Sequence, residues 1–403
     1  MAARRGEARA VLRTDIAVIG AGIAGASVAA ELAAAGRRVT LLEAETTPGY
    51  HTTGRSAALW ILNYGPRDAR ILTRASRGFF ENPPQGFADH ALTRRRAVLS
   101  VAPPGQEEAL AAMLAEGEGL RAIGPEEARA LLPVLRPEAV AGAALEDDAF
   151  DIDVAALHQG YLRMLRANGG QVMTDARAGA IARRHGAWEI ATPAGTVSAP
   201  VLVNAAGAWG DVVARLAGLS PLGLTPMRRT ALLVDCPPGH DPAEWPLAGD
   251  VAHTWYVRPE ARRKLMLSPA DETPMEPCDV QPDEFDLALA VDRVQAALDL
   301  PVARIEHRWA GLRTFTPDRS LAIGPGHEPG FFWQVGQGGY GIQTAPAAAK
   351  LGAALVLGRD PAALGLAEAA QLADPRRFPS SPKVAPAGTR RATSAPQHLP
   401  GGR

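Results

Sequence analysis

The segment GAGIAG, residues 20–25, places three glycines at the GxGxxG spacing of a loop that binds dinucleotides. In such a loop Gly20 permits a tight turn, Gly22 lets the backbone approach a pyrophosphate, and Gly25 lets the following helix pack closely on a strand. The first N–H groups of that helix and the positive end of its dipole then face the phosphates. The spacing therefore predicts a chemistry that depends on a bound dinucleotide.

The segments around this loop give it the setting that the motif requires. The apolar run 15–20 is typical of a buried strand, the Ala-rich segment 23–35 of a helix, and the run 38–43 of a second strand. Glu43 ends that run, where its carboxylate would accept a hydrogen bond from a ribose hydroxyl and disfavour a 2′-phosphate. The three segments predict a β-α-β unit and hence a parallel α/β sheet.

Two later segments help to choose between NAD and FAD. VLVNAAGAW, residues 201–209, is typical of a strand that ends in small residues and returns to the adenosine end of a flavin cofactor. GQGGYGIQT, residues 336–344, is a glycine-rich turn before a helix, whose N–H groups could face the polar edge of a flavin. A chain with cofactor-binding segments near both ends favours FAD. An NAD-linked Rossmann enzyme stays the alternative, which a purified protein without yellow colour would support.

The composition is that of a globular protein with more than one domain. The 403 residues are 47% hydrophobic and 21% charged, with a net charge of −1, so nothing global points to nucleic acid or an anionic membrane. Cys236 and Cys278 form no CxxC pair and the histidines show no ligand spacing, so we expect no metal site. No apolar run approaches the roughly 20 residues that span a bilayer. We expect a cytoplasmic protein without a membrane span.

Nine motifs together resemble one family of flavoenzymes. In chain order they are VIGAGIAGAS, PGYHTTGRSAA, FFENPPQGF, DIDVAALHQGYLR, VLVNAAGAW, PMRRTA, WYVRP, WAGLRTF and GQGGYGIQT, and they cover most of residues 14–345. The chain resembles the FAD-dependent amine oxidoreductases of the D-amino-acid oxidase, glycine oxidase and sarcosine oxidase (DAO) family. Within that family its motifs are most similar to those of bacterial D-arginine dehydrogenases.

The resemblance implies a two-domain fold of α/β class, α+β overall. A Rossmann-like FAD-binding domain of the glutathione-reductase type would be joined to a substrate domain built on a mainly antiparallel β-sheet, as the alternating pattern of residues 220–310 also indicates. We assign residues 14–95, 150–220 and 311–373 to the FAD-binding domain and 96–149 and 221–310 to the substrate domain. Residues 1–13 are expected to be a flexible lead-in, and the Pro-, Ser- and Arg-rich residues 374–403 a disordered tail.

The chemistry implied is oxidation of a D-amino acid at its CH–NH2 group. Hydride passes to flavin N5, and the imino acid is hydrolysed to a 2-keto acid and ammonia. FAD would be non-covalent, because the sarcosine oxidase branch attaches flavin to a cysteine near the C-terminal glycine-rich segment, and neither cysteine lies there. Family likeness assigns the substrate carboxylate to two arginines, a surrounding and capping role to two tyrosines, a carbonyl for the amine to a glycine, and a place near the flavin to a glutamine. These residues are Arg229 and Arg313, Tyr64 and Tyr256, Gly311, and Gln337.

The motifs also carry over a set of cofactor-binding residues. They are Gly20, Gly22, Ile23, Ala24, Gly25, Glu43, Ala44, His51, Thr52, Thr53, Gly54, Arg55, Ser56, Ala57, Asn204, Ala205, Ala206, Gly207, Trp209, Gly311, Arg313, Gly338, Gly339, Tyr340, Gly341, Ile342 and Gln343. Within this set, residues 51–57 are small and polar and are expected to follow the pyrophosphate and ribityl chain. Residues 59–64 turn apolar and are expected to enter the substrate pocket.

Three positions depart from the D-arginine dehydrogenase pattern. A carboxylate that receives the guanidinium there corresponds here to Val98 or its neighbour Ala97, and a His and a Thr correspond to Leu59 and Ile61. A buried guanidinium without a partner is costly, and the arginines at 94–96 would repel one if they faced the pocket. We therefore expect D-amino acids with apolar or aromatic side chains to be preferred over D-arginine. Loss of the His leaves water, or substrate that is already neutral, to account for deprotonation of the amine.

Two other functions remain open. A glycine, sarcosine or N-methyl amino-acid oxidase of the same family would bind the same carboxylate, and a catalytically inactive flavin-binding protein would keep the fold alone. Retention of Arg229, Tyr256 and Arg313 argues against the inactive protein. The sequence does not indicate whether oxygen, a quinone or another carrier reoxidises the flavin, nor the oligomeric state.

Overall fold

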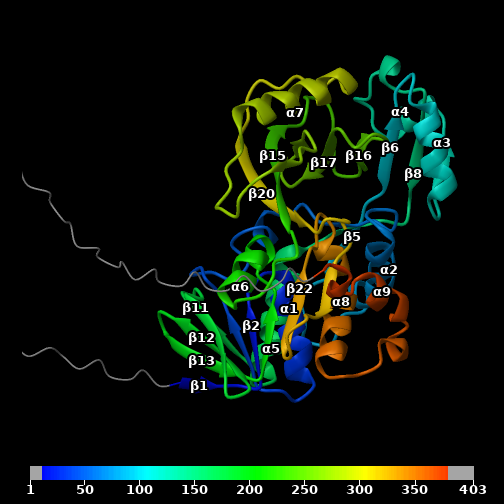
Figure 1. The fold of residues 1–403 in the computed structure, drawn as a ribbon. Coiled ribbons are helices and arrows are strands. Elements are labelled where there is room, and N and C mark those ends of the chain that lie inside the picture. The colour runs from blue at the N-terminus through cyan, green and yellow to red at the C-terminus, as the bar shows by residue number, and fades with distance from the viewer. Residues whose placement is uncertain (1–10, 380–403) are drawn as a thin grey trace, which may run out of the picture.

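The lobe drawn at the bottom of Figure 1 is built on the predicted β-α-β unit. In the computed structural model, which describes residues 11–379, strand β2 (Ile16–Ile19) leads into helix α1 (Ile23–Ala34), and strand β3 (Val39–Leu42) pairs with β2 in parallel. Both strands are buried at every residue, as expected for a parallel sheet that is covered on both faces. The first prediction from the sequence is thus confirmed.

Further strands extend this pair into a six-stranded sheet of order β10-β3-β2-β14-β22-β21. All neighbours run parallel except β21 and β22, which are antiparallel. The added strands are β10 (Gln171–Met173), β14 (Val201–Asn204), β21 (Ala322–Pro325) and β22 (Phe331–Val335). Segments from the start, middle and end of the chain therefore meet in one sheet, which makes this lobe discontinuous in sequence.

The two faces of the sheet are covered differently. Ile16 and Val18 pack into a core with α1, while Ala17 and Ile19 pack into a second core with Trp188, because successive residues of a strand face opposite ways. The helical layer and its neighbours are α1, α5 (Val154–Ala167), α8 (Gly341–Val356), α2 (Arg67–Glu81) and α9 (Ala367–Leu372). The opposite layer holds a four-stranded sheet of β1 (Val11–Arg13), β13 (Gly195–Ala199), β12 (Ala187–Thr192) and β11 (Ala180–Arg184), with α6 (Gly210–Leu216) beside it.

The upper lobe of Figure 1 is a nine-stranded, mainly antiparallel sheet of order β19-β15-β18-β17-β16-β6-β8-β7, with β20 paired to β15. One neighbouring pair, β16 and β6, is parallel. Its strands are β6 (Val98–Ala102), β7 (Arg121–Ile123), β8 (Gly142–Glu146), β15 (Thr225–Asp235), β16 (Leu247–Asp250), β17 (Tyr256–Glu260), β18 (Lys264–Ser268), β19 (Thr273–Pro274) and β20 (His307–Phe315). Helices α3 (Glu107–Glu116), α4 (Pro125–Leu131) and α7 (Glu284–Ala297) cover it.

A three-stranded sheet lies where the chain passes between the lobes. It consists of β4 (Leu59–Trp60), β9 (Phe150–Ile152) and β5 (Thr93–Arg95). Just after β5, Arg96 donates to Asp151 of β9 at 2.5 Å and to the carbonyl of Trp245 at 2.5 Å, and its side chain is 5% exposed. This buried ion pair ties the first crossing segment to both lobes.

The structure corrects several boundaries predicted from the sequence. Residues 11–13, expected in a flexible lead-in, form β1 and pair with β13. Residues 374–379, expected in a disordered tail, include a 3-10 helix whose Arg377 pairs with Asp318 at 2.7 Å. Strand β20 runs through position 310 to Phe315, so Gly311 and Arg313 lie on the substrate-domain sheet, not in the FAD-binding domain. The rest of the predicted lead-in and tail, 1–10 and 380–403, lies outside the described residues.

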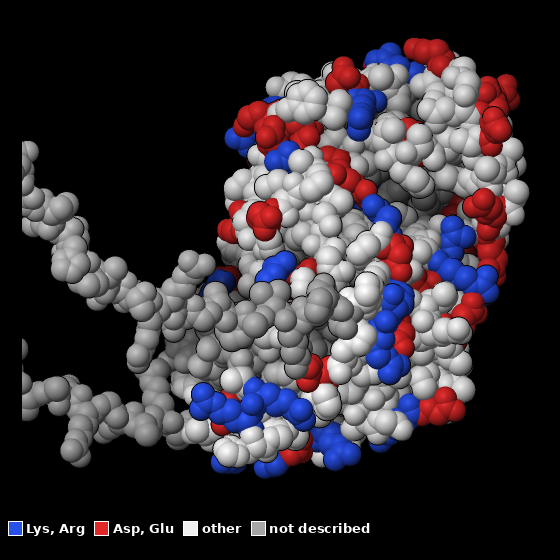
Figure 2. Space-filling view, viewed as in Figure 1, with Lys and Arg blue, Asp and Glu red and all other residues white. Residues whose placement is uncertain are grey.

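Neither a membrane helix nor a metal cluster is found between residues 11 and 379. No helix in that part of the chain has the length and hydropathy needed to cross a bilayer, and no three His, Cys, Asp or Glu residues there are grouped as metal ligands. On the face shown in Figure 2, basic and acidic side chains are interspersed over the upper lobe. This mixed surface agrees with the near-zero net charge.

Candidate active site

A single long cavity of about 1060 Å³ is lined by residues of both lobes, from the glycine-rich loop at one end to the nine-stranded sheet at the other. All six predicted catalytic residues and all three predicted pocket residues line it. So do most of the predicted cofactor residues, namely Gly20, Gly22, Ile23, Ala24, Glu43, Ala44, His51, Thr52, Thr53, Arg55, Ser56, Ala57, Ala205, Ala206, Gly207, Trp209, Gly338, Gly339, Gly341, Ile342 and Gln343.

The glycine-rich loop has the geometry of a phosphate cradle. Gly20 has a φ of +101°, and a Cβ there would lie 2.5 Å from the carbonyl oxygen of Ala205. A Cβ on Gly25 would lie 1.8 Å from the carbonyl oxygen of Gly20, so helix α1 approaches the loop as closely as a backbone allows. Gly22 precedes helix α1 as its N-cap residue and has no side chain to cap it, and Thr53 accepts a hydrogen bond from the N–H of Ile23 at 2.9 Å.

Glu43 is held at the mouth of this loop. Its two carboxylate oxygens accept hydrogen bonds from the N–H of Ala21 at 2.8 Å and the N–H of Glu45 at 3.0 Å. The side chain is buried and lines the cavity. The site combines a glycine cradle, the N-terminus of a helix and a fixed carboxylate along one cavity. This combination fits an adenine dinucleotide such as FAD.

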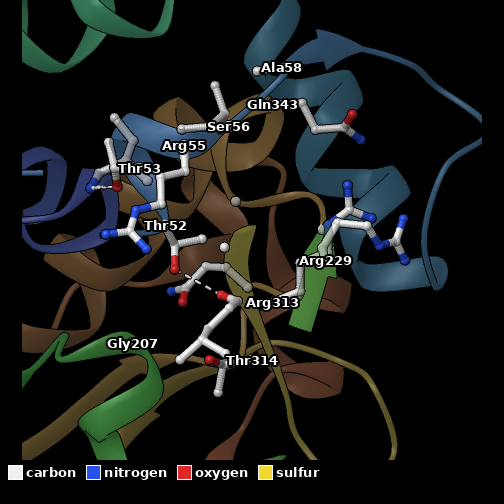
Figure 3. Close-up of a pocket in the computed structure, with 18 of the residues that line it drawn as sticks. Thr52, Thr53, Arg55, Ser56, Ala58, Gly207, Arg229, Arg313, Thr314 and Gln343 are labelled. Atoms are coloured by element: carbon white, nitrogen blue, oxygen red, sulfur yellow. Dashed lines mark hydrogen bonds between the residues drawn. The ribbon is translucent and has the colours of Figure 1, made fainter. Parts of the chain in front are cut away.

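The segment 51–57 lies along the cavity as expected, but one of its side chains has a different role. Thr52 donates to the carbonyl of Leu312 at 2.8 Å, a contact drawn in Figure 3. The guanidinium of Arg55 pairs with Asp279 and donates to the carbonyls of Val280 and Ala310, each at 3.1 Å. The guanidinium of Arg55 therefore holds this segment against the substrate lobe. Only the backbone and the aliphatic part of the side chain remain to contact a cofactor.

Four predicted cofactor residues do not line the cavity. Gly25 and Gly54 are needed for close packing, because a Cβ on Gly54 would lie 2.8 Å from the carbonyl oxygen of Gly49. Asn204 is fully buried and its amide donates to the carbonyl of Gly210 at 2.8 Å. Tyr340 donates to the carbonyl of Arg319 and packs its ring against Tyr64. The contacts of these four residues support those that line the cavity, and their own contact with the cofactor stays a prediction.

The paired strands β15 and β20 place the carboxylate-binding candidates on one face. Arg229 lies directly opposite Gly311 in the ladder, and Arg313 follows Gly311 by two residues, so all three share a face. Figure 3 shows the side chains of Arg229 and Arg313 on the same side of the cavity. The neighbouring Arg228 faces the other way and pairs with Asp286 of α7 at 2.8 Å. Of the two arginines in PMRRTA, the strand register thus selects Arg229 for the cavity.

Electrostatic coupling links these arginines to two tyrosines. Arg313 donates to the hydroxyl of Tyr64 at 3.0 Å, and a Cβ on Gly339 would lie 2.6 Å from that hydroxyl, which brings the C-terminal glycine-rich turn against the same group. Burial and the charge of Arg313 lower the pKa of Arg229. Burial by itself raises the pKa of Tyr256, but Arg313 and Arg229 outweigh it, so the net shift is downward. Two guanidinium groups that line one face of a cavity could together bind a carboxylate.

One acidic residue beside these arginines was not predicted. Glu272 lies 3.3 Å from a terminal nitrogen of Arg229 and 2.9 Å from one of Arg319, and it lines the cavity. It follows the bend at Ala270, which has a φ of 53° and also lines the cavity. Nothing in the segment PADETP distinguishes this carboxylate from surface acids, so no sequence signal marks it.

The predicted apolar pocket residues meet in space. Leu59 and Val98 form one buried cluster with Ala149, and Ile61 and Leu247 pack against it. They come from strands β4, β6 and β16 and the segment after β4, and all but Ala149 line the cavity. Of the two positions considered from the sequence, Val98 lines the cavity and Ala97 does not.

The three arginines before this cluster point elsewhere. Arg94 pairs with Glu244 at 2.5 Å, Arg95 donates to the carbonyl of Asp147 at 3.3 Å, and Arg96 pairs with Asp151. None of them lines the cavity. The repulsion of a cationic substrate that these residues could have caused is therefore absent.

A second unpredicted acid, Glu146, closes the apolar cluster at one end. It is 6% exposed, lines the cavity, and accepts hydrogen bonds from the N–H of Leu62 at 2.7 Å and the amide of Asn63 at 3.0 Å. Burial raises its pKa, against the hydrogen bonds from Asn63 and Leu62. The sequence marks Glu146 only as an acid at the end of the apolar run GAALE. Its position in the cavity follows from the pairing of β8 with β6, which the sequence does not show.

Asn63 also fastens the loop after α3 over the cavity. Its amide oxygen accepts from the N–H of Glu118 at 2.8 Å and its amide nitrogen donates to the Glu118 carbonyl at 2.9 Å. We expect Asn63→Ala to lower the free energy of unfolding by about 1–3 kcal/mol, because it leaves part-buried partners unsatisfied. Arg74→Gln, which removes only an exposed ion pair with Glu118, should cost no more than about 0.5 kcal/mol. Equal losses in urea titrations of the two variants would contradict this.

Comparison with known proteins identifies the family. The family model described as FAD dependent oxidoreductase (DAO) matches residues 15–355. Glycine oxidase from Pseudomonas aeruginosa is 28% identical over 371 residues, covering 86% of this chain and 95% of the relative. The bifunctional protein MnmC of tRNA 5-methylaminomethyl-2-thiouridine biosynthesis from Polaromonas naphthalenivorans is 28% identical over 371 residues, and FAD-dependent oxidoreductase domain-containing protein 1 from Mus musculus is 26% identical over 281. The chain spans little more than half of these last two, 56% and 57%.

Solved structures show the same fold. L-proline dehydrogenase from P. horikoshii superimposes with a TM-score of 0.76 at 20% identity, covering 92% of this chain and 98% of that one. Glycine oxidase from Geobacillus kaustophilus superimposes with a TM-score of 0.75 at 21% identity, covering 87% and 96%. The family match extends over the glycine-rich loop, strands β15 and β20 and the C-terminal glycine-rich turn alike. The chain therefore belongs to the DAO family of FAD-dependent oxidoreductases.

Proposed function

We propose that this oxidoreductase oxidises D-amino acids at the CH–NH2 group, giving an imino acid that water converts to a 2-keto acid and ammonia. The observation that carries the proposal is the convergence of Arg229, Gly311 and Arg313 on one face of the cavity, next to Tyr64 and Tyr256. A planar guanidinium donates two parallel hydrogen bonds to a carboxylate. Two such groups would fix the substrate by its carboxylate and leave its Cα to be oriented by the surrounding groups.

Each group has a role in that orientation. The carbonyl of Gly311 would accept a hydrogen bond from the substrate amine, and Tyr64 and Tyr256 would enclose the bound carboxylate. Gln337, whose amide donates to the carbonyl of Gln334 at 2.8 Å, would lie near the flavin. FAD, bound without a covalent link, supplies the acceptor for the hydride that leaves Cα. Neither Cys236 nor Cys278 lines the cavity, which supports a non-covalent cofactor.

The substrate amine must be neutral before hydride leaves, and no histidine occupies the positions of Leu59 or Ile61 that line the pocket. Water, or substrate that enters already neutral, would serve. The apolar wall of Leu59, Ile61, Val98 and Leu247 supports a preference for apolar or aromatic D-amino acids over D-arginine. The further likeness to D-arginine dehydrogenases stays a prediction, as do the domain boundaries not corrected above and a cytoplasmic location.

Anaerobic mixing with D- and L-amino acids tests the proposal. Bleaching of the flavin absorbance by D-phenylalanine, D-methionine or D-leucine, and not by their L-enantiomers, is the expected result. D-arginine should reduce the flavin less efficiently than these. Admission of air afterwards reports whether oxygen reoxidises the flavin or whether a quinone or another carrier is required. Bleaching by L-amino acids alone, or D-arginine as the best substrate, would contradict the assignment.

A second candidate is a glycine, sarcosine or N-methyl amino-acid oxidase. The match to Pseudomonas aeruginosa glycine oxidase over 95% of that protein favours it. Glycine, sarcosine and D-proline in the same assay distinguish the two, because the second candidate reacts faster with these small or secondary amines than with D-phenylalanine. A flavin that no amine reduces would instead indicate an inactive flavin-binding protein.

A further inference from the structure

Two rows of cross-strand partners form the roof of the substrate end of the cavity. In the first row Tyr256 lies beside Gly249, and Gly249 beside Ser100. In the second row Leu247 lies beside Val98, and Val98 beside Glu146. Residues that pair across strands point to the same face of a sheet, and all members of both rows line the cavity. The roof therefore runs from a tyrosine beside the arginines to a carboxylate at the other end.

Glu146 is a buried carboxylate at the end of an otherwise apolar wall, which is an unusual environment for a charged group. It is 6% exposed, and no arginine, lysine or histidine within residues 11–379 forms an ion pair with it. Its cross-strand neighbour Val98 and the adjacent Leu59 belong to the apolar cluster. A buried carboxylate costs stability unless its acceptor sites are used. Its oxygens accept hydrogen bonds from the N–H of Leu62 and the amide of Asn63, with the Asn63 N–H also nearby. A carboxylate has about four acceptor sites, so one remains for a donor in the cavity that Glu146 lines.

The distance along the roof suits one amino-acid substrate. Strands β17, β16, β6 and β8 are consecutive, and Glu146 lies two residues along β8 from the row that contains Tyr256. At about 4.8 Å per strand and about 3.4 Å per residue, the Cα atoms of Tyr256 and Glu146 lie roughly 16 Å apart. Both side chains reach into the cavity and shorten that span. Between them, Gly249 and Ser100 present little bulk, and Leu247 and Val98 present apolar surface. A substrate held by its carboxylate near Tyr256 could thus extend its side chain along this surface toward Glu146.

We propose that Glu146 determines substrate specificity by accepting a hydrogen bond from a neutral donor at the end of an otherwise apolar D-amino-acid side chain, such as a phenol hydroxyl or an indole N–H. This inference rests on the proposed function and narrows its substrate class. A neutral donor suits the site better than a cation, because the wall along which the side chain would extend is apolar and a cation is costly to desolvate there. Phenol and indole groups also carry the apolar rings that the wall of Leu247 and Val98 would cover.

The test compares D-tyrosine with D-phenylalanine, which differ only by the hydroxyl, in the FAD-loaded protein. Wild type is expected to favour D-tyrosine in kcat/KM by about tenfold or more, and Glu146→Gln to reduce that ratio about tenfold, because the charge that strengthens the hydrogen bond is lost. Glu116→Gln is the matched control, since Glu116 is an exposed carboxylate that lines the same cavity. It should leave the ratio unchanged.

Each outcome decides the proposal. An unchanged ratio in Glu146→Gln, or an equal loss with both substrates, would assign Glu146 a structural role and overturn it. D-lysine or D-arginine as the best substrate would overturn the choice of a neutral donor. If Glu146→Gln fails to bind FAD, Glu146→Asp keeps the charge one methylene further away, and an intermediate ratio supports the proposal while a wild-type ratio contradicts it. Failure of every D-amino acid to reduce wild-type flavin is a separate result that refutes the proposed function itself.

Discussion

Replacement of Arg313 by methionine is expected to lower kcat/KM for D-amino acids by roughly a hundredfold to a thousandfold, the cost of leaving a bound charge without its partner. Arg313 lies on the cavity face of β20, two residues from Gly311, and holds the hydroxyl of Tyr64 at 3.0 Å. Arg313→Lys should recover only part of the loss, because an ammonium does not reproduce the two parallel hydrogen bonds of a guanidinium. Steady-state kinetics on the FAD-loaded variants measure both effects.

The matched control lies on the same strand. Arg308 of β20 is exposed and pairs with Glu284 at 2.6 Å, outside the cavity. Arg308→Met removes the same charge from the same element and should keep kcat/KM within about twofold of wild type. The visible spectrum of each variant checks that FAD remains bound. A loss of less than tenfold in Arg313→Met with normal FAD content would refute the carboxylate-binding role.

Gly25→Ala is expected to abolish FAD binding, so that the purified protein is colourless or insoluble. A Cβ at Gly25 would lie 1.8 Å from the carbonyl oxygen of Gly20, and because both groups belong to the backbone, neither can move aside as a flexible side chain would. The first turn of α1 would have to shift away from the loop, which would open the phosphate cradle. The ratio of flavin absorbance to protein absorbance after purification measures the effect.

A second helical glycine provides the control for that substitution. Gly78 of α2 is exposed, and nothing lies within 4 Å of a Cβ built there. Gly78→Ala should therefore leave FAD content normal and raise the free energy of unfolding by about 0.5–1 kcal/mol, since alanine is the better helix former. Normal FAD content in Gly25→Ala would show that the loop does not depend on this close contact.

The sequence predicted best those parts of the fold in which one local pattern determines one element. The strand at 15–20, the helix at 23–35 and the strand at 38–43 follow from apolar runs and glycine placement, and the structure confirms each within about two residues. Helix α7 was not predicted. Its segment EFDLALAVDRVQAA lies within residues 220–310, whose alternating pattern led us to predict an antiparallel sheet throughout. The strand β1 was missed because three residues carry too little pattern to mark a strand.

The site residues likewise fall into those that a local motif predicts and those that only the tertiary structure places. Residues carried over by motif, such as Arg229 and Arg313, line the cavity because the motif itself includes the strand that presents them. Glu146 and Glu272 are placed by pairings between distant segments, β8 with β6 and the bend before β19 with β15. A single sequence does not record those pairings. The arginine side chain of Arg55 was misplaced for the same reason, because its partners Asp279 and Val280 lie far along the chain.

The strand order of the upper lobe has a practical consequence for redesign. The arginines proposed to bind the carboxylate lie on β15 and β20, toward one end of the sheet. Leu247, Val98 and Glu146 lie on β16, β6 and β8, toward the other end. Leu247, Val98 and Glu146 could therefore be substituted together to change which substrate side chains the enzyme accepts. Arg229 and Arg313, which are proposed to bind the carboxylate common to all amino acids, would stay unchanged. Variant libraries confined to Leu247, Val98 and Glu146 would therefore change the side-chain specificity while keeping the proposed carboxylate site.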